Sequence, residues 1–280
     1  MSRDKPQRAD ARREGVGYER EDRRAGGAAM TQWDPSVYGR YADERSRPFY
    51  ELTARIRAED PGYVVDLGCG TGDLTVSLAA RWPDARIHGV DSSPEMIAKA
   101  PEGATFEVAD VRDWRPAEPV DVIVSNALLQ WVPEHRELLV GWARELNPGG
   151  WLAFQVPGNF AAPSHQVVRE LCRSPEWAAE LADLAWRDPV DSAADYLELL
   201  AAEGLTVDAW ETTYVHVLQG DDAVLRWVTG TALRPMLTRL APERRERFLA
   251  DAGRLLGEAY PRRDYGTPFE FRRIFTVAHK

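Results

Sequence analysis

The sequence predicts an α/β protein built on a doubly wound, mostly parallel sheet, and three observations lead to this fold class. Short apolar runs rich in β-branched residues alternate with segments of helix formers between residues 64 and 156. A glycine-rich stretch joins the first run to a helix, as in the ligand-binding turns of such sheets. Acidic or amide residues follow successive runs, where parallel strands present their carboxyl ends.

The elements of this sheet can be placed along the chain from their composition and their end signals. The first strand begins at Val64, and four more are expected over Ile87–Asp91, Thr105–Ala109, Val120–Ser125 and Trp151–Val156. Helices are expected at about 48–57, 74–80, 94–99 and 135–146. Pro48 suits the first turn of a helix, and Asn147-Pro148-Gly149-Gly150 ends the last of these helices.

The regular alternation loosens after Pro157. Helices are expected at 164–172, 177–185, 193–202, 221–228, 231–240 and 242–256, with a long strand at 206–218. Phe269–Ala278 alternates bulky and charged residues, which is typical of an edge strand. We expect the helices in about 160–204 and 221–258 to form a cap over the strand tips, within a single domain of residues 30–280.

The first 29 residues differ in composition from the rest of the chain. They contain eight Lys or Arg, six Asp or Glu and four Gly, with few large apolar residues. Such a segment cannot bury enough apolar surface to offset the entropy of ordering it. We therefore expect residues 1–29 to be a disordered N-terminal extension, with the folded part starting near Met30.

Composition excludes several classes of function. The net charge of −10 disfavours nucleic acid as a partner, because phosphate backbones bind basic surfaces. No apolar run approaches the roughly 18 residues that span a bilayer, and no signal-peptide core is present. The two cysteines, Cys69 and Cys172, have neither disulfide nor metal-ligand spacing. We expect a soluble, cytoplasmic protein without a metal or a membrane partner, and the number of subunits is left open.

The glycine-rich stretch reads Asp66-Leu67-Gly68-Cys69-Gly70-Thr71-Gly72-Asp73. Three alternating glycines allow positive φ and let a ligand approach the backbone closely, and a small residue such as Cys69 suits the same loop. A dinucleotide fingerprint would need G-x-G-x-x-G/A, whose last position is here occupied by Asp73. The spacing therefore disfavours a nicotinamide site.

The tips of the next three expected strands carry Asp91, Asp110 and Asn126. An acid at the second tip can accept hydrogen bonds from both hydroxyls of a ribose, and Asp91 stands 19 residues after Gly72, as one helix and one strand require. Asp110, followed by Val111, can bind an adenine amino group. Ser92 or Ser93 suits the N-cap of the helix that follows.

Several motifs resemble known methyltransferases. Asp66–Gly72, Gly89–Met96 and Leu146–Gly150 resemble motifs of the class I S-adenosylmethionine-dependent methyltransferases. Other stretches are similar to the trans-aconitate 2-methyltransferase family: Trp33-Asp34-Pro35 with Tyr38, Tyr41 and Arg45, then Ser125–Pro133, Gln155–Phe160, Trp227–Pro235 and Phe269–Phe275. The resemblance covers most of the chain from Met30 onward.

This resemblance implies a seven-stranded, Rossmann-like sheet whose last strand runs antiparallel. It also implies methyl transfer from S-adenosylmethionine to a carboxylate of trans-aconitate, giving a monomethyl ester and S-adenosylhomocysteine. The expected cofactor-binding residues are Asp66, Gly68, Cys69, Gly70, Gly72, Asp91, Ser92, Met96, Asp110, Val111 and Asn126.

The implied chemistry asks for positioning and not for acid–base catalysis. A carboxylate is already ionised at pH 7, because its unperturbed pKa is about 4, so it needs no general base to attack a sulfonium methyl group. The protein has to align the reactants and exclude water. Gln130 and Trp131, just past the fourth strand, are expected to border the transfer point, and His165 and His216 are candidates for the cap pocket.

A small tricarboxylate substrate favours arginines, which bind carboxylates through two parallel hydrogen bonds. The expected substrate-binding residues are Tyr41, Arg45, Arg47, Arg234 and Arg272. Arg272 and Arg273 are adjacent on a strand and point to opposite faces, so at most one of them reaches the ligand.

Three alternatives stay open from the sequence. The enzyme could methylate another carboxylate, such as a malonyl thioester on a carrier protein. It could be a nicotinamide-dependent oxidoreductase on the same sheet, although Asp73 counts against this. It could also bind S-adenosylmethionine without catalysing a reaction, since no catalytic base is required whose absence would reveal this.

Overall fold

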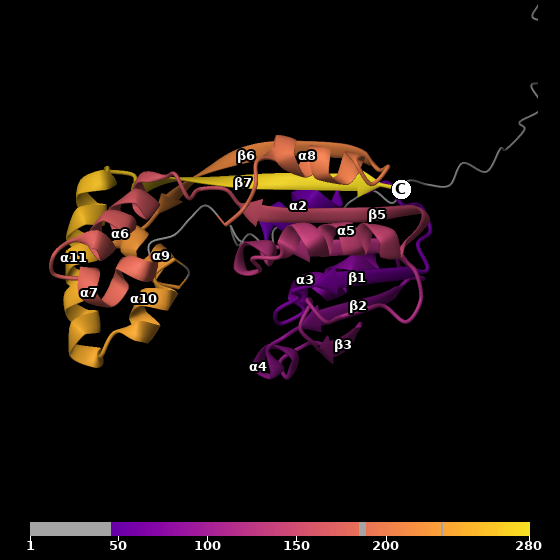
Figure 1. The fold of residues 1–280 in the computed structure, drawn as a ribbon, viewed down its shortest axis with the longest axis horizontal. Coiled ribbons are helices and arrows are strands. Elements are labelled where there is room, and N and C mark those ends of the chain that lie inside the picture. Colours follow the sequence, from indigo (N-terminus) through magenta and orange to yellow (C-terminus); the bar gives the residue numbers. More distant parts are fainter. Residues whose placement is uncertain (1–45, 185–188, 231) are drawn as a thin grey trace, which may run out of the picture. The chain divides into compact units, whose positions relative to one another are not determined.

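A computed structural model describes residues 46–184, 189–230 and 232–280. These residues contain a seven-stranded sheet in the order β3-β2-β1-β4-β5-β7-β6 (Figure 1). The strands are β1 (Tyr63–Leu67), β2 (Arg86–Asp91), β3 (Thr105–Val108), β4 (Val120–Asn126), β5 (Leu146–Pro157), β6 (Thr206–Leu218) and β7 (Thr267–His279). The predicted fold class and the seven strands are confirmed.

The parallel half of the sheet is built around β1, which pairs with β2 on one side and β4 on the other. Val64, Val65 and Leu67 are fully buried, because helices or turns cover both faces of a parallel strand. The connections contain α3 (Asp73–Ser77) with the 3₁₀ turn η1 (Leu78–Ala80), α4 (Pro94–Ile97), η2 (Leu129–Trp131) and α5 (His135–Glu145). Strands β1 to β5 all run parallel, so their carboxyl ends lie at one edge of the sheet.

The two longest strands, β6 and β7, form an antiparallel pair, and β7 also pairs antiparallel with β5. The prediction that Phe269–Ala278 forms an edge strand is wrong, because β7 lies between two strands and β6 is the edge. The charged residues at 270–273 gave this segment the alternation of bulky and charged residues that is typical of an edge strand. Glu270 and Arg272 lie where the β6–β7 pair extends past β5, whose pairing with β7 ends at Arg273, whereas Phe275, Val277 and Ala278 are buried in the sheet.

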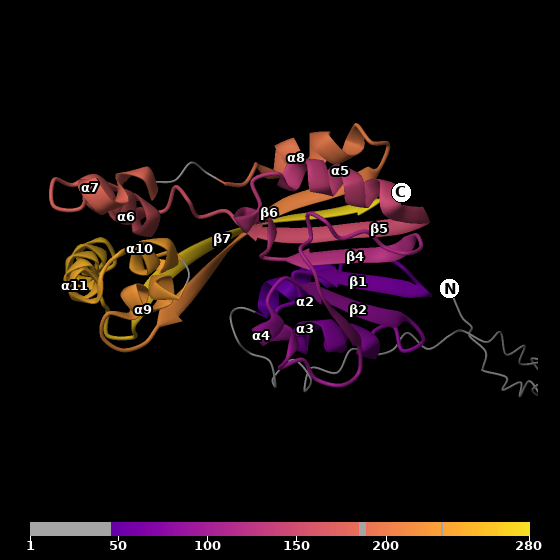
Figure 2. The same cartoon turned by 60° about the horizontal axis from the view of Figure 1, so that its bottom comes forward.

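Helices cover the two faces of the sheet (Figure 2). On one face α5 lies beside α8 (Ala193–Ala201), and Trp142 and Tyr196 belong to one apolar core with the sheet. On the other face α2 (Arg47–Thr53) contributes Phe49 and Leu52 to a second core. The predicted cap ran to about residue 204, but α8 packs on the sheet. Tyr196, for example, contacts Phe154 of β5 with ring centroids 5.0 Å apart.

Five further helices form a group with a core of its own, which we call the helical cluster. They are α6 (Pro163–Arg173), α7 (Ala178–Leu181) with the 3₁₀ turn η3 (Ala182–Leu184), α9 (Ala223–Thr229), α10 (Arg234–Arg239) and α11 (Pro242–Ala259). Trp177, Leu233 and Phe248 are fully buried in this core, together with Phe269 of β7. The helical cluster lies beyond the carboxyl ends of the parallel strands (Figure 1).

Helix ends follow local signals. Pro48, Pro94, Pro163 and Pro242 each stand in the first turn of a helix, where a missing N–H costs nothing. Within the described residues, none of the helices is both long enough and apolar enough to cross a bilayer.

Candidate active site

The glycine-rich loop leaves β1 and enters α3 through three residues of left-handed backbone. Gly68, Gly70 and Gly72 have φ of 80°, 58° and 80°. The amides of Gly68 and Cys69 both donate to the carbonyl of Val90, at 2.8 and 3.0 Å, so the loop is held against β2. Such a turn costs L-residues with a side chain about 1–2 kcal/mol per position, which explains the glycines.

The surroundings of the three glycines differ. A Cβ on Gly72 would lie 2.4 Å from the ring of Phe106, and one on Gly68 would lie 2.8 Å from Cβ of Leu128. A Cβ on Gly70 would meet nothing within 4 Å. Gly70 is therefore the point of the loop where the backbone borders open space and a ligand can approach it.

Asp91, at the tip of β2, binds the loop to the following helix. One carboxylate oxygen accepts from the amide of Gly70 and the other from the amide of Ser93, both at 2.9 Å. Ser93 is the N-cap of α4, since its Oγ accepts from the amide of Met96 at 3.2 Å. A carboxylate offers about four lone pairs, so Asp91 keeps acceptor capacity for hydroxyl groups.

A cavity of about 190 Å³ lies beside these residues, and we call it the small cavity. Its walls include five residues predicted to bind the cofactor: Gly68, Asp91, Ser92, Asp110 and Val111. Arg112 also lines it, and its Nε donates to both carboxylate oxygens of Asp110 at 2.9 and 3.1 Å. This hydrogen bonding lowers the pKa of Asp110 to about 2, so the carboxylate stays an acceptor throughout the neutral range.

Other predicted cofactor residues line neither this cavity nor the next. Asp66 is buried beneath the loop, where the hydroxyl of Thr75 donates to it at 2.6 Å, and burial raises its pKa to about 6. Cys69 is a thiol whose pKa burial raises to about 12. Met96 is exposed on α4, and Gly72 packs on Phe106. Gly70, whose amide donates to Asp91, lines neither cavity either. Asp66, Cys69, Gly70 and Gly72 build the loop and its support, whereas Met96 belongs to α4.

A second cavity, of about 580 Å³, lies at the carboxyl ends of β4 and β5 and reaches the helical cluster; we call it the large cavity. Residues at the ends of β4 and β5 and just after them line one part of it: Asn126, Ala127, Gln130, Trp131, Pro157, Asn159 and Phe160. Asn126 was predicted to bind the cofactor, and the structure places it on this wall and not on that of the small cavity. The helical cluster and β7 contribute His165, Trp227, Arg234, Pro235, Phe269, Phe271 and Arg273 among others. Trp131 lines both cavities, so they adjoin at its side chain.

A strained residue sets the direction of the chain after β4. Ala127 has φ of 58°, in the left-handed region that disfavours a side chain. Its amide donates to the carbonyl of Gln155 at 2.9 Å, and its carbonyl accepts from Nε2 of Gln130 at 2.5 Å. This turn carries Gln130 and Trp131 to the cavity wall. Backbone strain of this kind is retained where the surrounding structure requires it, often at functional sites.

The structure distinguishes the two adjacent arginines of β7. Arg273 lines the large cavity and is only 8% exposed, with its guanidinium 4.6 Å from the ring centroid of Phe271. Arg272 points to the other face, where its Nε donates to Glu211 at 2.9 Å and its Nη1 to the carbonyl of Gly158 at 2.9 Å. The structure does not bring the predicted Arg272 to the cavity and places Arg273 there instead.

The remaining predicted substrate residues divide in the same way. Arg234 lines the large cavity at the start of α10. Arg47 does not line it: its Nε lies 2.6 Å from Glu51 and its guanidinium stacks on Tyr214. Tyr41 and Arg45, like Tyr38, lie outside the described residues. Of the two candidate histidines, His165 lines the large cavity, whereas His216 is buried and stacks on Trp227.

Asn159 is a functional candidate that the sequence analysis did not select. It follows β5, lines the large cavity and is 5% exposed, and its Oδ1 has no hydrogen-bond partner among the described residues. The rule that selected Asn126, a polar residue just after a parallel strand, applies equally to Asn159 and would have found it.

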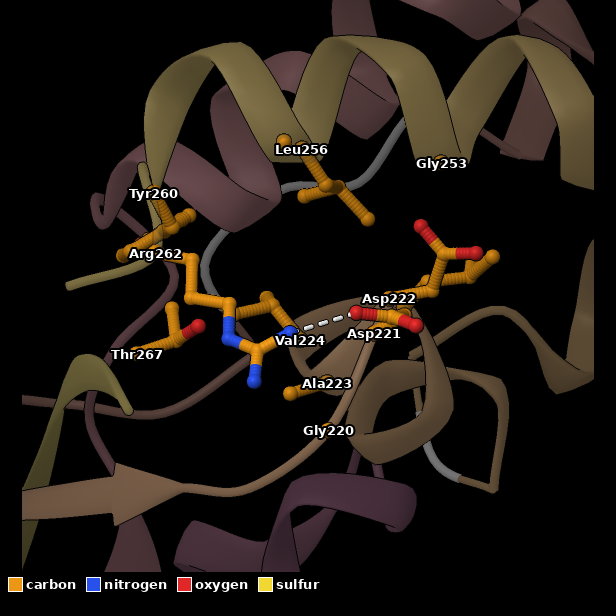
Figure 3. A pocket seen from close by; sticks show the side chains of 12 residues that line it. Gly220, Asp221, Asp222, Ala223, Val224, Gly253, Leu256, Tyr260, Arg262 and Thr267 are labelled. Atoms are coloured by element: carbon orange, nitrogen blue, oxygen red, sulfur yellow. Dashed lines mark hydrogen bonds and ion pairs between the residues drawn. The ribbon is translucent and has the colours of Figure 1, made fainter. Parts of the chain in front are cut away.

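A third cavity, of about 260 Å³, lies inside the helical cluster between α9 and α11 (Figure 3). Gly253 of α11 faces Asp222, which begins α9 with φ of 49°. Nη1 of Arg262 pairs with Asp221 at 2.6 Å on its wall. None of the predicted site residues described by the structure lines it, so the candidate active site consists of the other two cavities.

The sheet order, the antiparallel last strand and the glycine loop with Asp91 beside it define the class I methyltransferase fold. A family model described as "Methyltransferase domain" matches residues 38–209. A crystal structure from Bacillus halodurans with a methyltransferase description superposes with a TM-score of 0.54 at 13% identity, covering 84% of this chain and 99% of the other. That likeness shows the fold.

Close relatives give a narrower assignment. The chain is 53% identical over 265 residues to the trans-aconitate 2-methyltransferase of Streptomyces avermitilis, covering 90% of this chain and 98% of the relative. It is 56% identical over 250 residues to that of Rhodococcus jostii, covering 88% and 98%. The chain belongs to the trans-aconitate 2-methyltransferase family. The alternative of a nicotinamide-dependent oxidoreductase is therefore set aside.

Proposed function

We propose that this protein transfers the methyl group of S-adenosylmethionine to a carboxylate of trans-aconitate, giving the monomethyl ester and S-adenosylhomocysteine. The names of its relatives support this reaction. The observation that carries the proposal is the meeting of two unlike cavities at Trp131. One has the carboxylates of Asp91 and Asp110 on its wall, the second paired with Arg112, and the other holds two arginines. A cofactor and a polyanionic acceptor need these opposite environments side by side.

The small cavity fits S-adenosylmethionine. Asp91 has lone pairs left for ribose hydroxyls, and the ionised Asp110 can accept from an adenine amino group. The open space beside Gly70 leaves room for a ligand against the loop backbone. When bound, S-adenosylmethionine supplies an electrophilic sulfonium methyl group.

The large cavity fits a carboxylate substrate. Arg273 and Arg234 line it, and a guanidinium binds a carboxylate through two hydrogen bonds with complementary charge. Asn126 and Asn159 add amide groups to the same wall. The reacting carboxylate is ionised at neutral pH, so no side chain has to remove a proton from it.

Gln130 and Trp131 are proposed to position the reacting groups. Both follow the strained Ala127 turn, and the bond from Gln130 to the Ala127 carbonyl fixes the direction of the glutamine amide. Trp131 stands between the two cavities and can shield the transfer from water. We also propose that the helical cluster acts as the cap, since residues of α6, α9 and α10 line the large cavity.

The net charge of −10 favours a small acceptor over a carboxylate carried on an acidic carrier protein, which would dock on a basic surface. Both cysteines are unpaired thiols, as in proteins of reducing compartments, so we propose a cytoplasmic site of action.

The first test measures methyl transfer from S-adenosylmethionine to a panel of di- and tricarboxylates, with the esters identified by mass spectrometry. We expect trans-aconitate to be the best acceptor. A higher kcat/KM for a malonyl thioester, or an absence of any ester product, would contradict the proposal.

The second test compares Arg273→Met with Arg272→Met, which remove the same charge from adjacent positions. A hydrogen bond to a charged group contributes about 1.5–3 kcal/mol, so Arg273→Met should raise the KM for trans-aconitate at least tenfold. Arg272→Met should change it less than threefold, because Arg272 faces Glu211 outside the cavity. Equal effects of the two substitutions would remove Arg273 from the substrate site.

A further inference from the structure

Three polar side chains on neighbouring strands form a buried hydrogen-bonded chain. Nη1 of Arg273 donates to Oε1 of Gln155 at 3.3 Å, and Nε2 of Gln155 donates to Oδ1 of Asn126 at 2.6 Å. Asn126 pairs with Gln155 across β4 and β5, and Gln155 pairs with Phe275 across β5 and β7. Arg273 stands two residues before Phe275 on β7, so its side chain lies on the same face of the sheet as those of Gln155 and Asn126.

The two ends of this chain differ from its middle. Arg273 and Asn126 both line the large cavity, whereas Gln155 is 1% exposed and lines neither cavity of the candidate site. Gln155 therefore cannot contact a substrate in the described structure. It acts on the cavity only through its two neighbours.

The direction of every bond in the chain follows from the arginine. A guanidinium donates hydrogen bonds and accepts none, and it stays protonated in proteins. Gln155 must therefore turn its oxygen toward Arg273 and its NH₂ group toward Asn126. Asn126 must in turn present its oxygen to Gln155, which leaves its Nδ2, a donor, as the end of the amide that Gln155 does not engage.

We propose that Gln155 is a positioning residue for the acceptor. Through this chain Arg273 sets the orientation of the Asn126 amide, so that Nδ2–H and the guanidinium both donate to carboxylate oxygens of the substrate. The inference rests on the proposed function, because it needs a carboxylate in the large cavity. On this proposal, the preference of the large cavity for a carboxylate over a neutral group depends on Gln155, a residue that touches no ligand.

The variant Gln155→Glu tests the orientation directly. Glutamate has nearly the same shape but only accepts, so Asn126 must reverse its amide to donate to it, which turns Oδ1 toward the substrate carboxylate. We expect the KM for trans-aconitate to rise at least tenfold, while the Kd for S-adenosylhomocysteine measured by calorimetry changes less than twofold. The matched control is Gln219→Glu, at an exposed position outside both cavities, which should leave both values unchanged.

A double-mutant cycle separates orientation from the added charge. In an Asn126→Ala background there is no amide to reverse, so Gln155→Glu should raise the KM less than threefold further. The same factor in both backgrounds would mean that the new carboxylate merely neutralises Arg273, and it would overturn the proposal. An unchanged KM in the single variant, or a loss of affinity for S-adenosylhomocysteine alone, would also overturn it.

A second variant covers the case in which Gln155→Glu does not fold, as judged by circular dichroism. Gln155→Met keeps the volume and removes both hydrogen bonds, so the Asn126 amide is free to rotate and the KM should rise at least threefold; an unchanged KM would contradict the proposal. If the unmodified enzyme does not methylate trans-aconitate, the proposed function fails. The cycle is then run with the carboxylate of the panel that the enzyme does methylate.

Discussion

At the scale of single residues, the glycines of the loop after β1 share a left-handed backbone but have different neighbours. The ring of Phe106 occupies the space that a side chain at position 72 would need, whereas Gly70 borders open space. Packing therefore requires glycine at position 72, and we propose that the approach of a ligand requires it at position 70. A substitution at each position separates the two requirements.

Gly70→Ala should lower the affinity for S-adenosylhomocysteine at least tenfold and the free energy of unfolding by only roughly 1–2 kcal/mol, the cost of the left-handed backbone. Gly72→Ala adds a steric clash of about 1–3 kcal/mol with the Phe106 ring, so it should destabilise more. Calorimetry and urea unfolding of both variants check this. A larger loss of stability in Gly70→Ala would contradict the assignment.

Asp66 is a buried carboxylate with an unusual proton affinity. Burial is the main reason that its pKa rises from 3.8 to about 6, the hydroxyl of Thr75 lowers it, and the charge of Asp91 raises it. The folded state therefore binds a proton more tightly than the unfolded state. Stability from this group is present below about pH 4 and is lost as the pH rises through 6.

Asp66→Asn should remove this pH dependence. A difference of about two pKa units corresponds to about 3 kcal/mol, so the stability of the unmodified protein should fall by about that amount relative to the variant between pH 4 and pH 7. Urea unfolding of both proteins at several pH values measures it. Parallel pH profiles would show that the pKa of Asp66 is not raised.

The candidate site also shows what residue patterns can predict. Asp91, Asp110 and Asn126 were selected by their place after a strand, and the structure brings all three to cavity walls, because parallel strands end at a common edge. The choice between Arg272 and Arg273 was beyond the pattern. It depends on which face of β7 turns toward the cavity, and that is set by pairing with β5 and β6.

At the scale of elements, α8 and β7 differ from their sequence expectations for one reason. The composition of each segment shows that it is amphipathic, but it does not identify the element against which the segment packs. In the structure Tyr196 and Leu200 of α8 are fully buried in the core of the sheet, and β7 is inserted between β5 and β6. The capping box at Ser192 and Asp195 begins α8.

Ser192→Ala tests whether α8 belongs to the sheet or to the cap. Its Oγ accepts from the amide of Asp195 at 3.2 Å, and loss of such a cap costs about 1 kcal/mol. Because α8 lines neither cavity of the candidate site, kcat/KM should stay within twofold. Ser192→Thr keeps a capping hydroxyl and should keep most of the stability. A loss of kcat/KM without a loss of stability would place α8 in the cap.

At the scale of the whole described structure, two sets of apolar cores share the strands β6 and β7. The sheet carries the small cavity, whereas the large cavity needs both the sheet and the helical cluster. Trp177 fills the core of the helical cluster, 5.1 Å from Phe248 in an edge-to-face contact, with Nε1 donating to Asp251 at 3.1 Å.

Trp177→Ala should therefore affect the two ligands differently. Truncation of a buried tryptophan costs about 3–5 kcal/mol, and here the loss is confined to the helical cluster. Below the melting temperature we expect the KM for trans-aconitate to rise at least fivefold, with the Kd for S-adenosylhomocysteine within twofold of the unmodified protein. A parallel loss of both affinities would show that the helical cluster and the sheet do not respond separately.

The fold class, the glycine loop and the acids at the strand tips follow from the amino-acid pattern alone, because hydrophobic periodicity and glycine spacing are local properties. The three-dimensional structure was needed to show that Arg273 and not Arg272 lines the large cavity, that α8 covers the sheet, and that Gln155 connects Arg273 to Asn126. These facts depend on contacts between residues that are far apart in the chain, 29 positions for Asn126 and Gln155 and 118 positions for Gln155 and Arg273. Such contacts arise from the pairing of β5 with β7 and the packing of helices on distant strands, which no local pattern contains.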